Sequence, residues 1–330
     1  MSVLVTGGAG YIGSHMVWEL IEAGQEVVVV DNLSTGFRWA VADKAHFVQG
    51  DAGDMELLAS TISTYNVDAI IHFAGSIVVP ESIEDPLGYY HNNTIKSRAL
   101  IAAAVKGGVK HFIFSSTAAV YGMPDANPVH EDAPLNPISP YGSSKMMTEI
   151  MLTDTSFAHD LKFVALRYFN VAGADPKGRT GQSTPRATHL IKVTSQAALG
   201  DRDKLLVFGT DYDTPDGTCI RDYIHVTDLV SAHLRALEHL RDNGENKILN
   251  CGYGNGYSVL EVVEAVKQAV GVDFTVELTD RRAGDPAALI AGADRIRKEL
   301  GWQPQLENLN TIVQQAYEWE KHLIENGLKV

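Results

Sequence analysis

Short apolar runs alternate with longer amphipathic stretches along the first half of the chain. Each run is rich in valine, isoleucine or phenylalanine and has the length of a strand, whereas the stretches between the runs are long enough for helices. Strands separated by helical patterns favour right-handed βαβ crossovers, and hence a mostly parallel, doubly wound sheet of the α/β class. The predicted strands of this part are residues 3–5, 26–30, 47–48, 69–73, 112–114 and 163–166.

The rhythm changes near residue 171, where glycine, proline and charged loops become frequent. We expect a smaller, mixed α/β domain there, but the segment 223–251 again has the pattern of a helix and a strand and is expected to return to the main sheet. The predicted division is therefore 1–170 plus about 223–251 for one domain, and 171–222 plus 252–330 for the other. The predicted elements of this half are helices at 187–199, 227–240, 258–270 and 309–325 and a strand at 248–251.

An excess of acidic residues gives the 330-residue chain a formal net charge of −14 at pH 7. This charge argues against a nucleic acid or an anionic membrane surface as partner, because both require a basic patch. Apolar runs fall short of the ~18 residues of a membrane span. Cys219 and Cys251 are expected to be buried thiols, which favours the reducing cytoplasm. Since no lysine or arginine precedes Arg38, a signal peptide is not expected, and no His-Glu-x-x-His pattern predicts a metal site.

The glycine-rich segment after the first predicted strand is typical of a phosphate-binding turn. Gly7, Gly10 and Gly13 allow a tight turn and a close approach to a pyrophosphate, which the N–H groups at the start of the next helix can bind. Asp31 closes the second strand, where its carboxylate can accept a hydrogen bond from an adenosine ribose and repel a 2′-phosphate. We therefore predict NAD as cofactor. The alternatives are a simple turn at the glycines, a capping role for Asp31, and NADP binding assisted by Arg38.

Tyr141 and Lys145 stand at positions i and i+4 at the start of a helical pattern, so their side chains share one face. Ser115, Ser116 and Thr117 end the fifth predicted strand, at the edge where parallel sheets bind ligands. A tyrosine with a pKa near 10 is a poor base at neutral pH, but a nearby ammonium and an oxidised nicotinamide both favour the phenolate. The pattern predicts a tyrosine base assisted by a lysine, with an exposed pair at a helix start and a strand-end cap as alternatives.

The glycine segment, the polar triplet and the Tyr-x-x-x-Lys pair together resemble the short-chain dehydrogenase/reductase superfamily, and the chain length resembles its extended branch. This resemblance implies that Tyr141 is the general base, that Lys145 tunes it and holds the nicotinamide ribose, and that Thr117 hydrogen-bonds the reacting sugar oxygen. Members that eliminate water or decarboxylate resemble one another in carrying an acidic residue after this strand, whereas this chain has Ala118 and Ala119. Reversible hydride transfer at a carbinol is therefore expected.

Motifs over nearly the whole chain are similar to those of UDP-glucose 4-epimerases: residues 71–75, 89–93, 112–116, 166–170, 221–226 and 281–285. The resemblance implies a Rossmann-type fold, tightly bound NAD, and inversion of a UDP-hexose at C4 through a 4-keto intermediate. The cofactor residues it implies are Gly7, Gly10, Tyr11, Ile12, Gly13, Asp31, Asn32, Asp51, Ala52, Phe73, Ala74, Gly75, Asn92, Ser115, Tyr141, Lys145 and Phe169. The substrate residues it implies are Thr117, Asn170, His189, Phe208, Arg221, Arg282 and Asp285. The arginines suit a diphosphate, although each alone is more typical of a surface ion pair.

Three positions leave the cofactor affinity and the substrate open. Ile77 replaces a lysine that some relatives place near the cofactor phosphates, and His189 replaces a frequent asparagine. Leu289 lies where related enzymes set the room for a 2-N-acetyl group, and its intermediate size favours plain hexoses such as UDP-galactose and UDP-glucose. UDP-pentoses, UDP-N-acetylhexosamines and a non-catalytic NAD-binding role are the alternatives. By analogy, a homodimer would form through helices near 85–106 and 147–157.

Overall fold

A seven-stranded sheet forms the centre of the computed structural model, which describes residues 1–184, 188–282 and 285–328. The strand order is β10-β6-β5-β4-β1-β2-β3, and every neighbouring pair is parallel. The strands are β1 (Ser2–Thr6), β2 (Glu26–Asp31), β3 (His46–Gln49), β4 (Val67–His72), β5 (His111–Thr117), β6 (Lys162–Tyr168) and β10 (Lys247–Cys251). Each overlaps one apolar run, so the predicted doubly wound, parallel α/β sheet is confirmed.

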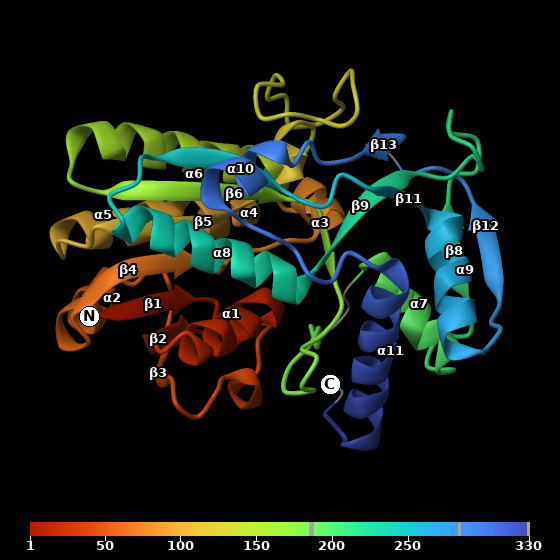
Figure 1. Ribbon diagram of the computed structural model, residues 1–330, viewed down its shortest axis with the longest axis horizontal. Coiled ribbons are helices and arrows are strands. Elements are labelled where there is room, and N and C mark those ends of the chain that lie inside the picture. The colour runs from red at the N-terminus through yellow and green to blue at the C-terminus, as the bar shows by residue number, and fades with distance from the viewer. Residues whose placement is uncertain (185–187, 283–284, 329–330) are drawn as a thin grey trace.

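Helices cover both faces of this sheet, and each face has its own core because side chains alternate along a strand. In β1, Val3 and Val5 belong to the core on the side of α1 and α8, whereas Leu4 belongs to the core on the side of α2, α5 and α6. Figure 1 shows α8 lying across the near face of the sheet. These helices are α1 (Tyr11–Glu22), α2 (Met55–Thr64), α5 (Lys96–Lys106), α6 (Pro140–Ala158) and α8 (Val226–Arg241).

The second half of the chain adds two small sheets beside the main one. β9 (Ile220–His225) pairs with three short strands in a four-stranded sheet, and β8 pairs with β12 in a separate ribbon. Segment 223–251 is therefore divided, because β10 joins the main sheet as expected whereas residues 223–225 belong to β9. The remaining strands are β7 (Asn170–Ala172), β8 (Leu205–Phe208), β11 (Gly256–Ser258), β12 (Val276–Thr279) and β13 (Ala288–Leu289).

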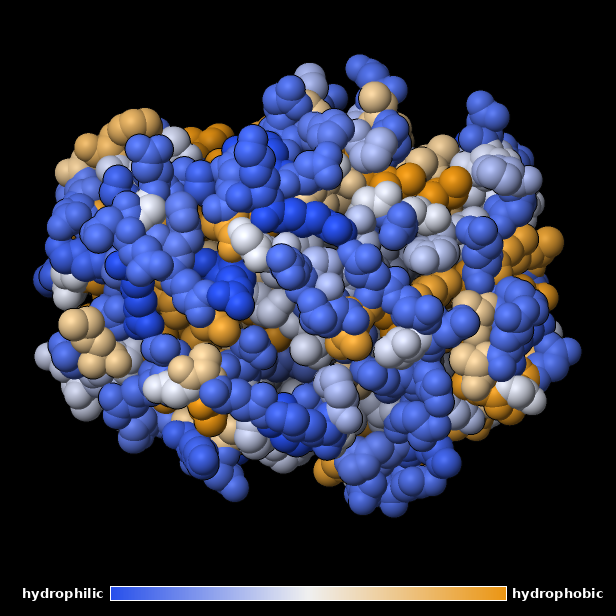
Figure 2. Space-filling model, in the orientation of Figure 1, coloured by the Kyte–Doolittle hydropathy of each residue, from blue (hydrophilic) through white to orange (hydrophobic). Residues whose placement is uncertain are grey.

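Four further helices complete this part, and Figure 1 places α7, α9 and α11 at the opposite end of the molecule from β1. Their bounds are α7 (Leu190–Ala198), α9 (Val259–Val270), α10 (Asp294–Leu300) and α11 (Leu309–Glu325). The predicted helix at 187–199 begins later than expected, at Leu190, and Ala187 lies outside the described residues. Figure 2 shows a mainly hydrophilic face, with apolar residues gathered near β12. No helix in the described part of the chain is long and apolar enough to cross a membrane.

The segment between β4 and β5 contains an unusual helix. α3 (Val79–Glu84) and the short α4 (Pro86–Tyr89) lead into the π-helix η2 (Tyr90–Ile95), which continues directly into α5. π-Helical turns are rare and frequently occur at functional sites. The hydrophobic pattern predicts only helix over this region, and η2 was not predicted. Asn92 and Asn93 lie within it, so η2 carries side chains that the motif at 89–93 had singled out.

Candidate active site

The predicted site residues gather at one edge of the main sheet, because parallel strands place their carboxyl ends together. Gly7 and Gly10 follow β1, Asp31 and Asn32 lie at the end of β2, and Asp51 and Ala52 follow β3. Phe73, Ala74 and Gly75 follow β4, and Ser115 and Thr117 lie at the carboxyl end of β5. The carboxylate of Asp51 forms an ion pair with the ammonium of Lys96 in α5 at 2.6 Å, which ties the segment after β3 to α5.

The glycine turn is as compact as its sequence predicts. Gly7 has a φ of +73°, and a Cβ atom there would lie 2.6 Å from the backbone nitrogen of Ala74. A Cβ atom at Gly13 would lie 2.1 Å from the carbonyl oxygen of Gly7. Both positions therefore require glycine. α1 begins at Tyr11, directly after Gly10, which has no side chain with which to cap the helix.

Asp31 is a buried carboxylate that faces this turn. One carboxylate oxygen accepts a hydrogen bond from the backbone N–H of Ala9 at 2.9 Å, and the other accepts from the N–H of Leu33 at 2.8 Å. The bond to Leu33 is the local turn bond that the capping alternative expected. The bond to Ala9 ties β2 to the glycine turn, and each oxygen keeps a lone pair for a further donor. The predicted bond to a ribose hydroxyl remains compatible with this geometry.

Tyr141, Lys145 and Thr117 form a buried cluster. Tyr141 and Lys145 lie in the first turns of α6, and the Thr117 hydroxyl donates a hydrogen bond to the Tyr141 oxygen. The Lys145 ammonium donates to the carbonyl oxygen of Ser115 at 3.0 Å and lies 5.0 Å from the centre of the Phe114 ring. The exposed pair that the sequence left open as an alternative is therefore wrong.

Burial shifts both titrating groups of this cluster. Desolvation raises the pKa of Tyr141 above its usual value, and the hydrogen bond from Thr117 opposes that rise. Desolvation lowers the pKa of Lys145 to about 8. Burial thus moves the two pKa values in opposite directions, and perturbed pKa values of this kind cluster at functional sites.

Asn93 of η2 connects the cluster to the end of β4, and the sequence reasoning did not single out its role. Its carbonyl oxygen accepts from the backbone N–H of Ser76 at 2.7 Å, while its amide donates to the Ser76 carbonyl at 3.0 Å and to the Ser144 hydroxyl at 3.1 Å. Ser144 stands next to Lys145 in α6. Asn92, the predicted residue, donates to the Ser76 hydroxyl at 2.9 Å. The only sequence signal for Asn93 was its place next to Asn92 in the motif at 89–93.

A buried ion pair behind the polar triplet was also missed. Arg167 of β6 donates to both oxygens of Glu149 in α6, at 2.6 Å from its Nη2 atom and at 3.0 Å from its Nε atom. The Ser116 hydroxyl donates to the same carboxylate, and Arg167 also donates to the Tyr121 hydroxyl at 3.0 Å. Ser116 lies between the two predicted site residues of β5, so its bond to Glu149 helps to hold this end of the strand in place.

Four of the predicted substrate residues form a chain of contacts in the second half of the protein. The Arg282 guanidinium lies 4.6 Å from the centre of the Phe208 ring and 3.2 Å from a carboxylate oxygen of Asp285. Arg221 of β9 lies 3.7 Å from the other oxygen of Asp285. An aromatic ring, two guanidinium groups and a carboxylate are thereby brought together, which suits a uridine diphosphate. Residues 283–284 of the motif lie outside the described residues.

Two further predicted substrate residues, Asn170 and His189, lie at the starts of β7 and α7. Asn170 begins β7, opposite Tyr223 of β9, and donates to the carbonyl oxygen of Asp222 at 3.3 Å. His189 precedes α7, and its Nδ1 atom lies 2.8 Å from the Gln182 amide. Burial and the nearby Lys192 ammonium lower the pKa of His189 to about 4, so this ring is neutral at physiological pH. Phe169 and Leu289 pack against the same apolar cluster, which includes Ala118. Within the described residues, no group of three or more histidine, cysteine or acidic side chains is arranged to hold a metal ion.

Comparison with known proteins decides the family. The pattern that defines the NAD dependent epimerase/dehydratase family matches residues 3–252. The chain belongs to this family.

Individual relatives match this chain over nearly its whole length. A UDP-glucose 4-epimerase of Azospirillum brasilense is 57% identical over 97% of this chain and 92% of that protein. The structure of a UDP-glucose 4-epimerase from Brucella ovis in complex with NAD is 46% identical, with a TM-score of 0.94 over 96% of this chain and 97% of that one. A UDP-Glc/GlcNAc 4-epimerase of Campylobacter jejuni is 49% identical, with a TM-score of 0.86 over 97% and 99% of the two chains. The predicted resemblance to UDP-glucose 4-epimerases is thus confirmed.

The residues of this family member fit NAD. Gly7 and Gly13 pack so closely against neighbouring backbone that the turn stays narrow, and α1 begins directly after it with no side-chain cap, so its first N–H groups are available to a phosphate. A small hollow lies over this turn, and its lining includes Gly10, Thr35 and Phe37. Asp31 offers a carboxylate to a ribose without a 2′-phosphate. NAD is accordingly the cofactor, as the glycine segment and Asp31 predicted.

Replacing Lys145 with an uncharged residue should raise the free energy of unfolding but lower turnover. The pKa of Lys145 in the folded protein, about 8, lies below the usual lysine value of ~10.4. At and below pH 8 the folded state therefore loses free energy of unfolding by holding a buried ammonium. This loss disappears as the pH rises toward ~10.4. Lys145→Met removes the penalty but also the bond to Ser115. We expect the free energy of unfolding at pH 7 to rise by about 1–3 kcal/mol while turnover falls.

Denaturant unfolding of the NAD-free proteins at pH 7 and pH 10 tests this expectation. The advantage of Lys145→Met should shrink at the higher pH. Lys106→Met, at the end of α5, is the matched control and should change neither stability nor its pH dependence appreciably. A variant at position 145 that is less stable than the parent at pH 7 contradicts the assignment of a desolvated ammonium.

Proposed function

We propose that the protein interconverts UDP-galactose and UDP-glucose by reversible epimerisation at C4, through a 4-keto sugar and transient reduction of bound NAD. The observation that carries this proposal is the buried cluster of Tyr141, Lys145 and Thr117 at the sheet edge that also bears the glycine turn. Ala118 and Ala119 follow this strand, so the positions next to the cluster offer no acid for dehydration. A non-catalytic NAD-binding protein would not need this cluster.

Bound NAD would supply the acceptor for the hydride from C4 and the donor of the hydride that reduces the 4-keto sugar. Tyr141 removes the proton of the C4 hydroxyl and later returns it. Thr117 hydrogen-bonds the same oxygen and keeps it within reach of the tyrosine. Tyr141 must be a phenolate to take this proton, and because burial raises its pKa, the positive charge of Lys145 would be needed to favour that phenolate.

Substrate capture rests on the second half of the chain. Arg221 and Arg282 can each donate to a diphosphate in place of their present contacts with Asp285, and Phe208 presents an aromatic ring to the uracil. Asn170 and His189 would complete the site. We propose that this half, 171–222 plus 252–330, holds the UDP-sugar, while 1–170 plus about 223–251 holds NAD. Arg282→Ala should weaken UDP binding without releasing NAD.

Leu289 supports plain hexoses over N-acetylated ones. It stands opposite Arg221 in the register of β13 and β9, and it packs near Ala118, the residue after Thr117. The sugar must lie between the diphosphate and Thr117, so Leu289 borders it. A leucine leaves less room there than a small residue would, and UDP-N-acetylhexosamines remain the second candidate substrates. Ile77, just before α3, is 43% exposed and offers no charge to the cofactor phosphates, so retention of NAD falls to the glycine turn and Asp31.

Incubation with UDP-galactose in the absence of added nicotinamide tests the proposal. UDP-glucose should form, and the denatured protein should release NAD rather than NADP. Product formation that requires added cofactor would contradict a retained NAD. No product from UDP-galactose, with NAD present in the extract, would redirect the assignment to UDP-pentoses.

An apolar surface over two neighbouring helical segments supports a homodimer. The exposed apolar side chains of this surface, which we call the helical patch, are Ile83, Leu87, Ile95, Met147, Ile150 and Phe157. They belong to α3, α4, η2 and α6, which pack against one another. Leu87 and Phe157 are 78% and 85% exposed in the single chain, more than large apolar residues of monomers usually are. We propose that a second copy of the chain covers this patch in the cytoplasm, where the buried thiols of Cys219 and Cys251 stay reduced.

Charge at the helical patch should disrupt the dimer. Placing a carboxylate where an apolar contact forms requires its desolvation, so Leu87→Glu with Ile150→Glu should shift the protein to monomers at concentrations where the parent is dimeric. Light scattering after size-exclusion chromatography measures the mass. Leu278→Glu on β12 is the control, since it is also exposed but lies outside the patch. A parent that is monomeric, or variants that stay dimeric, would rule this interface out.

A further inference from the structure

Asn127 holds the backbone on both sides of Leu289. Its amide nitrogen donates to the carbonyl oxygen of Ala288 at 3.1 Å, and its amide oxygen accepts from the N–H of Ile290 at 2.9 Å. Both polar atoms of the amide group thus bind the backbone of residues 288–290, although Asn127 itself is exposed. A surface asparagine with two such bonds to a single strand restricts where that strand can lie.

The two segments that meet here form a short ribbon. The N–H of Val129 donates to the carbonyl oxygen of Ile290 at 2.8 Å, and the N–H of Gly292 donates to the carbonyl oxygen of Val129 at 2.7 Å. One segment follows Thr117 and leads to Tyr141, and the other follows Arg282 and Asp285. The ribbon therefore joins the loop of the proton-transfer residues to the strand that borders the sugar.

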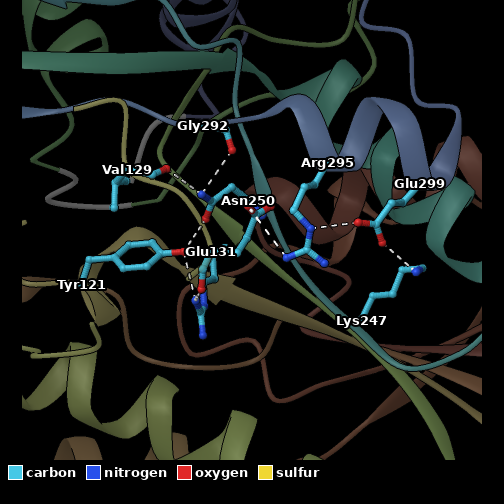
Figure 3. A network of polar contacts seen from close by, with 9 residues as sticks. Tyr121, Val129, Glu131, Lys247, Asn250, Gly292, Arg295 and Glu299 are labelled. Atoms are coloured by element: carbon cyan, nitrogen blue, oxygen red, sulfur yellow. Dashed lines mark hydrogen bonds and ion pairs between the residues drawn. The ribbon is translucent and has the colours of Figure 1, made fainter. Parts of the chain in front are cut away.

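The far end of the ribbon is fixed in the interior. Figure 3 shows Asn250 of β10 lying among Val129, Gly292 and Tyr121. Its amide donates to the carbonyl oxygens of Val129 at 2.9 Å and Gly292 at 3.3 Å, while its oxygen accepts from the Tyr121 hydroxyl at 2.7 Å. All the polar atoms of this side chain are bonded and buried, so this end has little freedom.

The two ends of the ribbon differ in consequence. The buried end at Asn250 is held by several interior bonds, whereas the end at Leu289 is held by the pairing of β13 with β9 on one side and by the Asn127 side chain on the other. Leu289 stands opposite Arg221 and packs against the apolar cluster of Ala118 and Val129. A small outward movement of β13 would enlarge the space between the diphosphate site and Thr117, and Asn127 opposes that movement.

We propose that Asn127 is a positioning residue for sugar specificity: it fixes Leu289 and thereby limits the size of the group that a UDP-hexose can carry at C2. The proposal rests on the proposed function and extends it to a residue outside the site. Asn127 does not contact the reacting atoms. It acts through the two hydrogen bonds to Ala288 and Ile290.

The test compares UDP-N-acetylglucosamine with UDP-glucose in the full-length protein. For Asn127→Ala, the ratio of kcat/KM for the N-acetylated sugar to that for the plain one should rise about 3- to 10-fold, and for Leu289→Ala about 10-fold or more. The double variant should show no further rise over Leu289→Ala, because both changes act on the same space. Asn127→Asp keeps the acceptor for Ile290 but loses the donor to Ala288, so its ratio should be intermediate.

Asn326→Ala is the matched control, an exposed asparagine that bonds to the backbone of His322 at the far end of α11. It should leave the ratio unchanged. A purely structural role for Asn127 would lower both activities equally, and an unchanged ratio would overturn the proposal. Dissociation constants of both sugars, measured by calorimetry on the same variants, give the ratio without turnover. If the parent does not epimerise UDP-galactose, the proposed function fails, and the binding ratio still decides the role of Asn127.

Discussion

Tyr141→Phe should lower kcat by about 100- to 10,000-fold, the range expected when a positioned general base is removed. The ring should stay in place, because Tyr141 is buried and the substitution deletes only the hydroxyl that Thr117 contacts. NAD content and the affinity for UDP should therefore be unchanged. The measurement is the rate of UDP-glucose formation from UDP-galactose under saturating conditions.

The matched control is Tyr317→Phe in α11, which deletes a tyrosine hydroxyl remote from the polar triplet. It should turn over at the rate of the parent. Near-parental turnover by Tyr141→Phe would contradict the assignment of the base. A loss of NAD from that variant would instead indicate that the hydroxyl serves cofactor binding.

Removing one partner of the Arg167–Glu149 pair should have the largest effect on stability. Both side chains are buried, and Arg167→Met leaves the Glu149 carboxylate without its guanidinium in the interior. Breaking such a pair typically lowers the free energy of unfolding by about 3–5 kcal/mol. Denaturant unfolding of the NAD-free protein measures this loss.

The double variant Arg167→Met with Glu149→Leu tests the reason for the loss. Replacing both charges by apolar groups removes the isolated carboxylate, so most of the stability should return. Arg235→Met is the control, because Arg235 pairs with Glu238 at 2.7 Å on the surface, and such pairs contribute only about 0.2–1 kcal/mol. Equal losses for Arg167→Met and Arg235→Met would show that burial of the pair is not the cause.

The main sheet and the cofactor turn could be predicted because their signals are local. Strands buried on both faces are continuous apolar runs, and the first run is followed at once by Gly7, Gly10 and Gly13. Tyr141 and Lys145 could be paired because a helix places i and i+4 on one face. Their burial against Thr117 required the sheet, which brings β5 beneath the start of α6.

The rest depends on contacts that no local pattern contains. β7, β11 and β13 have two or three residues each, too few for a period to emerge. Arg167 and Glu149 come from separate elements, and a charged residue inside an apolar run gives no indication of its partner. Asn127 resembles any loop asparagine until Ala288 and Ile290 are folded beside it.

The π-helix η2 (Tyr90–Ile95) makes the length of this part of the chain critical. Each residue of an α-helix turns the chain by about 100°, so a single deletion within η2 that restored α-helical geometry would rotate Asn93 and the following α5 relative to each other. Asn93 would then lose Ser76 and Ser144, or α5 would turn its apolar face away from the sheet. The helix between β4 and β5 must therefore keep its residue count, because both the contacts of Asn93 and the apolar face of α5 depend on it.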